Sequence, residues 1–520
     1  MPRIALTSQT TTGQSTGLVS HNSILLAGYW LLGLWAAAIA VTTAATYLIT
    51  AGSFDYVEGV ALGHQLMLAN GLPLYATASD QPPYSVPLYG PLFYWINSLL
   101  LDTQAPSFTA ARALNLLATI YLCGLAVSVA RRRLATGPAA AWLAVLLWLT
   151  LEPAAGFLLQ NRPDTLALAL GASGFIAATS QRRFALPCAA LLLTATAYTK
   201  QTAVLAPLLA ALLVLLTMQR RRDALVLLLT TAGMGLSVLL LLNTLTSGSY
   251  WDNAVLANLN GFSPGSALQA WSKAGRQPLF WLALVVMLSN LRTPGQRRGF
   301  AIYGLTSLAI YGLAVAKPGA NSNYFLEYSW CAALALAPLL DDLLRSNDGR
   351  RHGLLTALVL LAGVHTLVLA TQSLERLRAT AAAWPAHAEW LDYWQTAAGG
   401  PVASMRPGTQ LLLGHAPHVL DPHIIARLTE QGHFDESGLI EDLRSGSIGA
   451  VIAADDLTAG PGEFSNWSTG VRAAVARYYE KVDSLGYLSV WLPRLPGSNA
   501  VGTEKKLPAS GLEGHSHTAK

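Results

Sequence analysis

Long apolar stretches follow one another over residues 24–371, separated by short polar breaks. A helix of about 20 apolar residues is long enough to cross a lipid bilayer. The pattern therefore predicts a polytopic α-helical membrane protein with about eleven transmembrane helices. Several stretches are short for a full crossing, so we expect some helices to be broken. The predicted spans lie near residues 24–50, 107–130, 138–157, 164–180, 184–198, 202–218, 223–245, 278–291, 300–316, 325–343 and 354–371.

Polar segments flank and interrupt this apolar region. Residues 1–23 are expected to form a disordered cytoplasmic leader and residues 496–520 a disordered tail, because both are polar. Residues 51–106 form a long loop, in which the apolar spacing of residues 57–70 predicts a helix lying in the membrane interface. Residues 372–495 are predicted to form a small α/β domain.

The apolar pattern within this C-terminal segment predicts both strands and helices. Short apolar runs indicate buried strands at residues 410–413 and 450–453. Helical spacing indicates helices at residues 422–430 and 471–481.

Arginine pairs and triplets fall in every second break between the apolar stretches, at residues 131–133, 182–183, 220–222, 297–298 and 350–351. The positive-inside rule places these breaks in the cytoplasm. An odd number of spans then puts the N-terminus inside and the C-terminal segment outside. Composition agrees, because only 12% of the residues are charged and 52% are apolar. The net charge of +5 resides in membrane loops, so it does not indicate nucleic-acid binding.

The opposite breaks contain nearly all of the unusual polar groups near helix ends. The first holds Asp55 and Glu58, directly after the first span. Residues three apart share one face of a helix, so both carboxylates would lie on one side of a helix there. Other such groups occur in residues 161–164, 198–201 and 317–327. This segregation favours an enzyme site at one membrane surface.

Four sequence elements follow one another in a characteristic order. They are Asp55-Tyr-Val-Glu58, Gly71-Leu-Pro-Leu-Tyr75, the Pro-rich aromatic segment from Pro82 to Tyr94, and Arg112-Ala-Leu-Asn-Leu-Leu at the start of the next span. In this order the chain resembles the GT-C superfamily of membrane glycosyltransferases, near the bacterial relatives of protein O-mannosyltransferases and lipid A aminoarabinose transferase. The resemblance covers residues 24–371. Family members often have two adjacent acidic residues, whereas here two residues separate Asp55 from Glu58. The resemblance therefore does not decide which of the two carboxylates is the base.

The resemblance implies a GT-C-like enzyme of the bacterial inner (plasma) membrane, surrounded by membrane lipids. It would transfer a sugar from a polyprenyl-phosphate-type donor to an extracytoplasmic hydroxyl of a lipid, glycan or protein. Such a displacement needs one carboxylate as general base, and we choose Asp55. Glu58 would orient Asp55, hold acceptor hydroxyls or help to bind a divalent metal ion. No other cofactor is implied.

Basic and hydrogen-bonding side chains supply the remaining site candidates. Lys200 and Arg162 are the candidates for binding the donor phosphate. The substrate-binding candidates are Tyr89, Tyr94, Asp164, Gln201, Lys317, Asn321, Asn323, Tyr324 and Glu327.

Ordinary structural roles compete with these assignments. Asp55 and Glu58 would otherwise be solvated loop acids, and Lys200 an interfacial lysine. A direct pair between Arg162 and Asp164 is slightly favoured over phosphate binding by Arg162. A transporter would show internal repeats and ionisable groups near the bilayer midplane, and the sequence shows no clear repeat. A catalytically inactive scaffold is a third interpretation.

A histidine-rich stretch near residue 420 raises the question of a zinc site. His415, His418, Asp421 and His423 lie close together in the sequence. The stretch is broken by prolines and lacks a matching second ligand pair, so we do not predict a metal site there.

Overall fold

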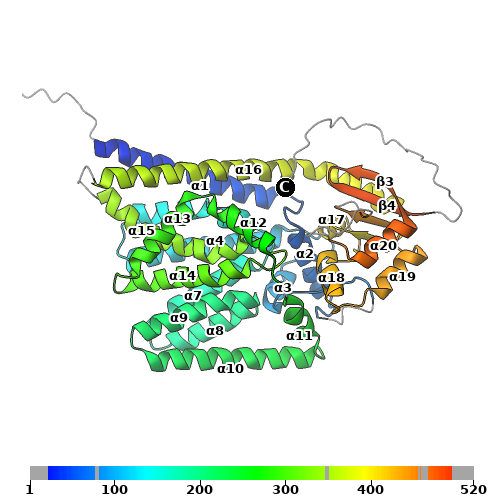
Figure 1. Cartoon of the computed structure of the whole chain (residues 1–520), viewed down its shortest axis with the longest axis horizontal. Coiled ribbons are helices and arrows are strands. Elements are labelled where there is room, and N and C mark those ends of the chain that lie inside the picture. The colour runs from blue at the N-terminus through cyan, green and yellow to red at the C-terminus, as the bar shows by residue number, and fades with distance from the viewer. Residues whose placement is uncertain are drawn as a thin grey trace, which may run out of the picture.

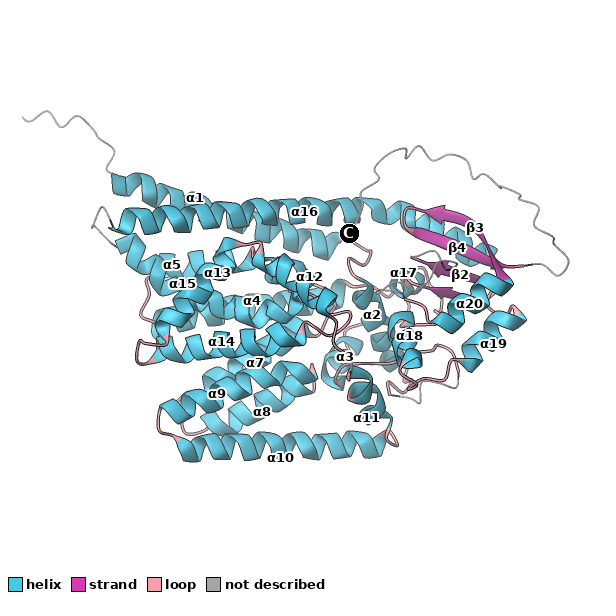
Figure 2. Cartoon of the chain, in the orientation of Figure 1, coloured by secondary structure: helices cyan, strands magenta, loops and turns pink. Residues whose placement is uncertain are grey.

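The computed structural model describes residues 21–75, 81–259, 261–345, 351–454, 457 and 466–494. The predicted tail and all but the last three residues of the predicted leader lie outside these ranges. Helices make up most of the described chain, and the strands are confined to its C-terminal part (Figure 2). The long helices run alongside one another as a bundle, and the small sheet lies at one end of it (Figure 1).

A helix of the bundle overlaps each of the predicted apolar stretches. Four of the described helices are long and apolar enough to cross a membrane, at Ala27–Ile49, Thr109–Arg132, Arg221–Leu245 and Gly353–Ala397. The bundle helices are α1 (His21–Ile49), α4 (Thr109–Arg132), α5 (Pro138–Leu149), α7 (Asp164–Ala178), α8 (Ala185–Ala197), α9 (Leu205–Thr217), α10 (Arg221–Leu245), α13 (Pro278–Asn290), α14 (Gln296–Ala314), α15 (Leu326–Arg345) and α16 (Arg351–Ala397).

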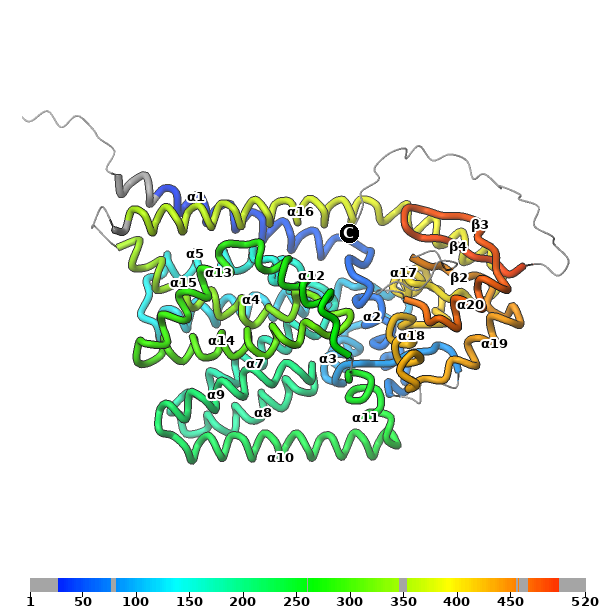
Figure 3. Tube along the Cα trace, viewed as in Figure 1, coloured from blue at the N-terminus to red at the C-terminus, as the bar shows by residue number. Residues whose placement is uncertain are grey.

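Helix α10 lies at the edge of the bundle (Figure 3) and shows how the bundle meets its surroundings. Only 11% of the residues in its most apolar 18-residue segment are buried. Leu229, Leu240 and Leu245 are all exposed. A continuous apolar face of this kind is unfavourable in water and favourable in lipid. The chain is therefore an integral membrane protein.

The predicted span at residues 138–157 is broken, as the expectation of broken helices allows. Helix α5 ends at Leu149, and the short helix α6 (Glu152–Phe157) begins after two intervening residues. Pro153 lies in the first turn of α6, where its missing N–H costs nothing, but it could not continue α5. The backbone N–H of Glu152 donates instead to Gln277 Oε1 at 2.7 Å.

Short elements fill the end of the bundle next to the sheet. They are α2 (Tyr56–Ala69), α3 (Pro91–Ser98), α11 (Ser249–Ala254), α12 (Pro264–Gly275) and the 3₁₀ turns η1 (Gln201–Val204), η2 (Leu256–Asn258) and η3 (Ser322–Phe325). The helix predicted at residues 57–70 is confirmed as α2. Its predicted place in the membrane interface is wrong, because residues 58–66 are all buried between the bundle and the C-terminal region. Gly59 and Gly63 permit close packing of α2 on Gly408 and Leu420 of the C-terminal region.

The C-terminal region contains a four-stranded sheet of order β1-β2-β4-β3. Strand β1 (Val402–Ser404) runs parallel to β2 (Ala450–Ala453), and β4 (Leu488–Pro493) pairs antiparallel with both β2 and β3 (Tyr479–Leu485). Residues of β2 alternate between two cores: Ile452 packs with Leu391 of α16, and Val451 packs with Val475 of α20 (Thr469–Tyr478). The sheet therefore lies between the end of α16 and the helices α19 (Ser437–Ser445) and α20.

Two of the four predictions for this region are confirmed and two need correction. The strand at 450–453 is β2, and the helix at 422–430 is α18 (Pro422–Glu430). The strand predicted at 410–413 is wrong, because this segment belongs to helix α17 (Pro407–Leu412), which has Pro407 in its first turn. The helix predicted at 471–481 ends at Tyr478, and β3 follows directly.

Helix α16 joins the bundle to the sheet (Figure 1). Its 47 residues span roughly 70 Å at about 1.5 Å per residue, more than twice the thickness of a bilayer core. The boundary predicted between residues 371 and 372 therefore falls inside one continuous helix. Near its end, Trp390 and Trp394 both donate hydrogen bonds to Asp483 in β3, at 2.8 and 2.9 Å.

Candidate active site

Asp55 begins helix α2 at the end of the bundle near the sheet. Its Oδ1 accepts a hydrogen bond from the backbone N–H of Val57 at 2.8 Å, so the side chain caps the helix. Its Oδ2 accepts from Arg162 Nη1 at 3.0 Å. The side chain is 23% exposed. One oxygen is thus committed to structure, whereas the other faces a cation and remains within reach of a substrate.

Glu58 lies one turn later and is fully buried. Its carboxylate accepts from Arg112 Nε at 3.0 Å and from Arg112 Nη2 at 2.8 Å. The backbone N–H groups of Phe54 and Asn161 each donate to it at 2.8 Å. Arg112 also donates to the carbonyls of Thr50 and Gly52. Glu58 therefore ties the end of α1, the start of α4 and the loop before α7 to one another.

The loop before α7 is held from two sides. Asn115 of α4 donates to the carbonyls of Gln160 and Arg162. Gln65 of α2 exchanges hydrogen bonds with the Asn161 side chain at 2.8 and 3.2 Å. These contacts fix the backbone beside Arg162, whose guanidinium is presented to Asp55.

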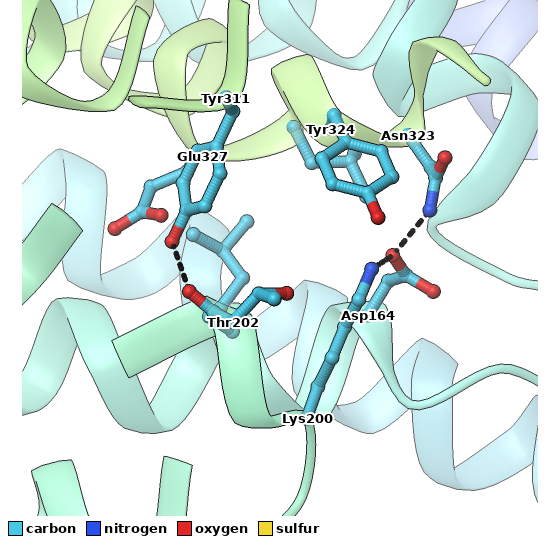
Figure 4. A pocket seen from close by; sticks show the side chains of 10 residues that line it. Asp164, Lys200, Thr202, Tyr311, Asn323, Tyr324 and Glu327 are labelled. Atoms are coloured by element: carbon cyan, nitrogen blue, oxygen red, sulfur yellow. Dashed lines mark hydrogen bonds and ion pairs between the residues drawn. The ribbon is translucent and has the colours of Figure 1, made fainter. Parts of the chain in front are cut away.

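A second carboxylate, Asp164, has three partners, of which Figure 4 shows Lys200 and Asn323. Lys200 Nζ lies 2.6 Å from its Oδ1, and Asn323 Nδ2 donates to the same oxygen at 2.7 Å. Arg162 Nε approaches its Oδ2 at 3.4 Å, so the predicted pair between Arg162 and Asp164 is present. Burial lowers the pKa of Lys200, but the Asp164 carboxylate outweighs burial and the net pKa is raised. Lys200 is therefore held in its charged form.

An open cavity of about 150 Å³, here called the basic cavity, is lined by Arg162, the partner of Asp55, and by Tyr56, the residue after Asp55. Its walls come from α2, the Pro-rich segment, the loop at residues 200–202, the loop at residues 317–324 and the start of α18. Eight of the predicted site residues line it: Tyr89, Tyr94, Arg162, Lys200, Gln201, Lys317, Asn323 and Tyr324. Segments far apart in the sequence thus bring most of the predicted site together.

Lys317 has a different environment from the other two cations of the basic cavity. Its Nζ donates to Asn258 Oδ1 at 2.8 Å. Among the described residues no carboxylate lies within salt-bridge distance of it. Burial, together with the nearby charges of Lys200 and Arg427, lowers the pKa of Lys317 to about 8. An anion entering the cavity would supply the counter-charge that the protein does not.

The C-terminal region contributes residues that the sequence did not indicate as site residues. Asp421, His423 and Ile424 line the basic cavity. Tyr56 of α2 donates to Asp421 Oδ1 at 2.8 Å, which fastens this region over the cavity. Burial raises the pKa of Asp421 to about 7, although the hydrogen bonds from Tyr56 and from the Ile424 N–H oppose the rise. In the sequence, Asp421 directly before Pro422 indicates the start of a helix, and this was the signal that could have drawn attention to Asp421.

The remaining predicted residues, including Asp55, are not among the residues that line the basic cavity. Asp164 and Glu327 line a smaller pocket of about 40 Å³ behind Lys200 and Tyr324 (Figure 4). Asn321 accepts from Lys273 Nζ at 3.2 Å. Glu58 is buried beneath the site, as described above.

The described residues were also considered for metal binding. No group of three or more His, Cys, Asp or Glu side chains lies together among them in a way that could hold an ion. His415 contacts Asp392 at 3.0 Å and His418 contacts Asp442 at 2.9 Å, so these histidines have separate partners. The residues do not fit the divalent ion that the family resemblance left open, and no step of the chemistry below uses one.

Comparisons with known proteins bear on the fold. The sequence matches no protein-family profile and no curated protein. The structure is similar to that of ArnT from Cupriavidus metallidurans bound to undecaprenyl phosphate, with a TM-score of 0.57 and 13% identity over 89% of this chain and 97% of that one. The apo state of ArnT matches with the same TM-score and identity over 90% and 98%.

A weaker likeness relates the chain to the oligosaccharyltransferase of Archaeoglobus fulgidus, at a TM-score of 0.49 and 11% identity, covering 88% of this chain and 73% of that one. At such low identities, the similarity to ArnT concerns the fold and does not specify activity. The architecture agrees with the order of motifs in the sequence. The chain shares its fold with ArnT.

Proposed function

We propose that this protein is a membrane glycosyltransferase that transfers a sugar from a polyprenyl-phosphate-type donor to an extracytoplasmic hydroxyl. One observation carries the proposal: the basic cavity brings together Lys317, which lacks a carboxylate partner among the described residues, Lys200 and Arg162, and Arg162 pairs with the half-buried carboxylate of Asp55. Cations to hold a leaving phosphate and a base to activate a hydroxyl are the two requirements of such a transfer.

Lys317 and Lys200 are the proposed phosphate ligands. Lys200 forms an ion pair with Asp164. Among the described residues, the hydrogen-bond partner of Lys317 is the neutral side chain of Asn258. Charge-assisted hydrogen bonds to phosphate are short and about twice as strong as neutral ones. The presence of undecaprenyl phosphate in ArnT, a protein of similar fold, supports a lipid phosphate as the donor group. Arg162, already paired with two carboxylates, would act on the phosphate mainly through its field.

The proposed reaction is a single displacement at the anomeric carbon. The acceptor oxygen forms a bond to that carbon, while the bond from the carbon to the phosphate oxygen breaks. The electron pair leaves on the phosphate, where Lys317 and Lys200 stabilise the developing charge. The hydroxyl proton passes to Asp55 Oδ2, the oxygen that faces Arg162. Glu58 would act as a positioning residue that fixes the backbone beside Asp55.

The sugar would lie among hydrogen-bonding groups that still have capacity. Gln201 donates from its Nε2 to the carbonyls of Leu88 and Ala254, and these bonds leave its side-chain oxygen as an acceptor. Asn323 donates to Asp164, and its Oδ1 is buried without a partner among the described residues. Tyr89, Tyr94 and Tyr324 supply aromatic walls. Asn321 and Glu327 would act on the sugar only through their neighbours.

The proposal includes an orientation in the membrane. At the bundle end away from the sheet, basic loops contact one another: Arg133 donates to Ile176 O, and Arg220 donates to Ser180 O. Gly137 N also donates to Asp341 there. With about eleven crossings, these loops would be cytoplasmic under the positive-inside rule. The basic cavity and the C-terminal region would then face the extracytoplasmic side of the bacterial inner membrane.

A transfer assay tests this function. Wild type and Asp55→Asn are incubated with a panel of polyprenyl-phosphate sugars, and release of polyprenyl phosphate is measured. We expect Asp55→Asn to lower the rate by about 10²–10⁴-fold, the usual contribution of a general base. Asp102→Asn, which changes an exposed loop acid, is the matched control. Undiminished transfer by Asp55→Asn would exclude Asp55 as the base.

A further inference from the structure

Three polar groups of the basic cavity take no part in the phosphate binding proposed above. They are His64 of α2, Tyr94 of α3 and Asp421 at the start of α18, and all three side chains are buried and line the cavity. The three cations of the cavity come from other segments, namely the loop before α7 and the loops at residues 200–202 and 317–324. The cavity therefore has polar walls that the phosphate does not occupy.

The spacing of residues along α2 explains why its histidine faces the cavity. The lining residues of this helix follow one another at intervals of one, three or four positions, so they share one helix face. Gly59 and Gly63 lie on another face, against Gly408 and Leu420 of the C-terminal region. Helix α2 thus packs on this region with one face and lines the cavity with the other, through Tyr56, Val57, Val60, Ala61 and His64.

His64 has one ring nitrogen engaged and one free. Its Nε2 lies 2.7 Å from Ser85 Oγ, whereas its Nδ1 is buried without a hydrogen-bond partner among the described residues. The ring packs edge-to-face on Tyr94, with 5.2 Å between the ring centres. Burial lowers the pKa of His64 to about 3, so the imidazole is neutral. A buried nitrogen that makes no hydrogen bond is unfavourable, and a ligand in the cavity would relieve this.

Asp421 likewise has one oxygen engaged and one free. Its Oδ1 accepts from the Tyr56 hydroxyl at 2.8 Å and from the Ile424 N–H at 3.1 Å. Among the described residues, no donor contacts its Oδ2 and no cation lies within salt-bridge distance. Of the described lining residues, Asp421 is the only acid. Its Oδ2 is therefore available to a ligand.

Free groups of these types suit a sugar. An imidazole nitrogen and a carboxyl oxygen both form hydrogen bonds with hydroxyl groups. In the proposed reaction the phosphate is bound to the anomeric carbon, so the hydroxyls on the other carbons remain for these groups. A site built to bond a hydroxyl rejects an analogue that lacks it or directs it elsewhere, because buried polar groups are then left unpaired.

We propose that His64 and Asp421 determine which sugar is transferred, each through a hydrogen bond to a ring hydroxyl remote from the reacting carbon. The substrate class is a neutral sugar carried on a phosphodiester. This proposal rests on the proposed function, because it concerns the donor of that reaction. It gives the C-terminal region a part in donor recognition, since Asp421 belongs to that region.

Equilibrium binding to the wild-type protein in nanodiscs tests this selection. The ligands are the farnesyl phosphodiesters of β-D-glucose, β-D-mannose, β-D-galactose and β-D-xylose, together with farnesyl methyl phosphate, which has the same charge and no sugar. Each of the other three sugars differs from glucose at one carbon. We expect the best sugar to bind at least about tenfold more tightly than the worst, as recognition of a hydroxyl by buried polar groups provides.

Substitutions at the two residues should remove this preference without removing the phosphate site. Asp421→Asn keeps an oxygen for Tyr56 and for the Ile424 N–H but replaces the free oxygen by an amide. It should reduce the ratio to below about threefold, as loss of one such hydrogen bond implies. His64→Gln, which retains a group near Nε2 only, should do the same. Binding of farnesyl methyl phosphate should not change in either variant, which shows that both are folded.

Two further variants serve as matched controls. His64→Asn places its amide near the position of Nδ1, so it should retain part of the preference that His64→Gln loses. Asp435→Asn makes the same carboxylate-to-amide change at an exposed turn of the C-terminal region and should leave the preference unchanged.

The outcomes separate this proposal from the proposed function. Equal binding of the four sugars to wild type would overturn the selection of sugars by this cavity. A preference that survives Asp421→Asn or His64→Gln would overturn the assignment of that residue. Lys317→Gln should weaken binding of all five ligands by a similar factor and keep the ratios between the sugars. Unchanged binding of farnesyl methyl phosphate by Lys317→Gln would count against the proposed function instead.

Discussion

At the scale of single residues, the two carboxylates of the Asp55-Tyr-Val-Glu58 element have different environments. Glu58 is fully buried and accepts four hydrogen bonds, two of them from Arg112. Asp55 is 23% exposed and pairs with Arg162, which lines the basic cavity. A catalytic base must reach its substrate, and a buried carboxylate with all its lone pairs engaged cannot. This difference supports Asp55 as the base and gives Glu58 a positioning role.

Substitution of these two residues should therefore affect stability and activity differently. Glu58→Gln leaves the buried Arg112 without its charge partner, which costs about 3–5 kcal/mol of unfolding free energy. Asp55→Asn keeps a good helix cap and should change stability by less than about 1 kcal/mol. Thermal unfolding of the purified variants in one detergent measures this contrast. A stable Glu58→Gln protein would show that the carboxylate does not hold the loop.

Lys317 gives the proposed phosphate binding a pH dependence. With its pKa lowered to about 8, the amine is charged below pH 8 and becomes neutral above it. A phosphate monoester completes its own titration near pH 6. Affinity for farnesyl phosphate should therefore be highest near pH 7 and fall by up to about tenfold per pH unit above pH 8.

Variants of Lys317 test the origin of that dependence. Lys317→Arg stays charged throughout, so its affinity should be nearly constant from pH 7 to pH 9.5. Lys317→Gln should bind weakly at every pH in this range. A wild-type affinity that does not change between pH 7 and pH 9.5 would contradict the assignment of Lys317 as a phosphate ligand.

At the scale of elements, the contact between α2 and α17 decides how the walls of the basic cavity meet. The two helices touch through Gly59 and Gly408, and Gly63 receives Leu420 against its backbone. Any side chain at these glycines must separate α2 from the C-terminal region. Because His64 is on α2 and Asp421 belongs to the C-terminal region, the same separation would change the distance between them.

Gly59→Ala should accordingly disturb both stability and function. A Cβ at this position meets backbone 2.6 Å away, and overpacking of this kind costs about 1–3 kcal/mol. Gly233→Ala is the matched control, because a Cβ there meets nothing within 4 Å and the residue is in the exposed helix α10. We expect a lower melting temperature and slower transfer for Gly59→Ala alone. Equal behaviour of the two variants would mean that the contact is not tight.

Local sequence patterns predicted the positions of the helices well and the tertiary contacts between elements less well. The apolar runs located the bundle helices, and the polar ends of those helices located most of the residues of the basic cavity. The strand predicted at residues 410–413 is a helix because four apolar or neutral residues carry no period, and the proline that starts α17 lies outside the run. Asp421 approaches the site through the tertiary contact of Gly59 with Gly408, which no local pattern contains.

At the scale of the whole molecule, two kinds of polar surface lie at opposite ends of an apolar bundle. One end contains the arginine loops, which contact one another through Arg133 and Arg220. The other end contains the basic cavity and the sheet (Figure 1). Helix α16 connects the two ends in one piece. An enzyme with this arrangement can draw lipid-linked substrates from the membrane on only one of its two sides.

Which membrane side holds the site can be tested by thiol labelling. Cys123, Cys188 and Cys331 are replaced by alanine, and a single cysteine is introduced at Ser445 in α19 or at Gln181 in the break after α7, both exposed positions at opposite ends. An impermeant maleimide should label Ser445→Cys in spheroplasts and Gln181→Cys only in inverted vesicles, as the positive-inside rule requires. The reverse pattern would place the site in the cytoplasm, where the proposed extracytoplasmic acceptor is absent. Labelling of both from one side would mean that the number of crossings between them is even, which would exclude the proposed count of spans.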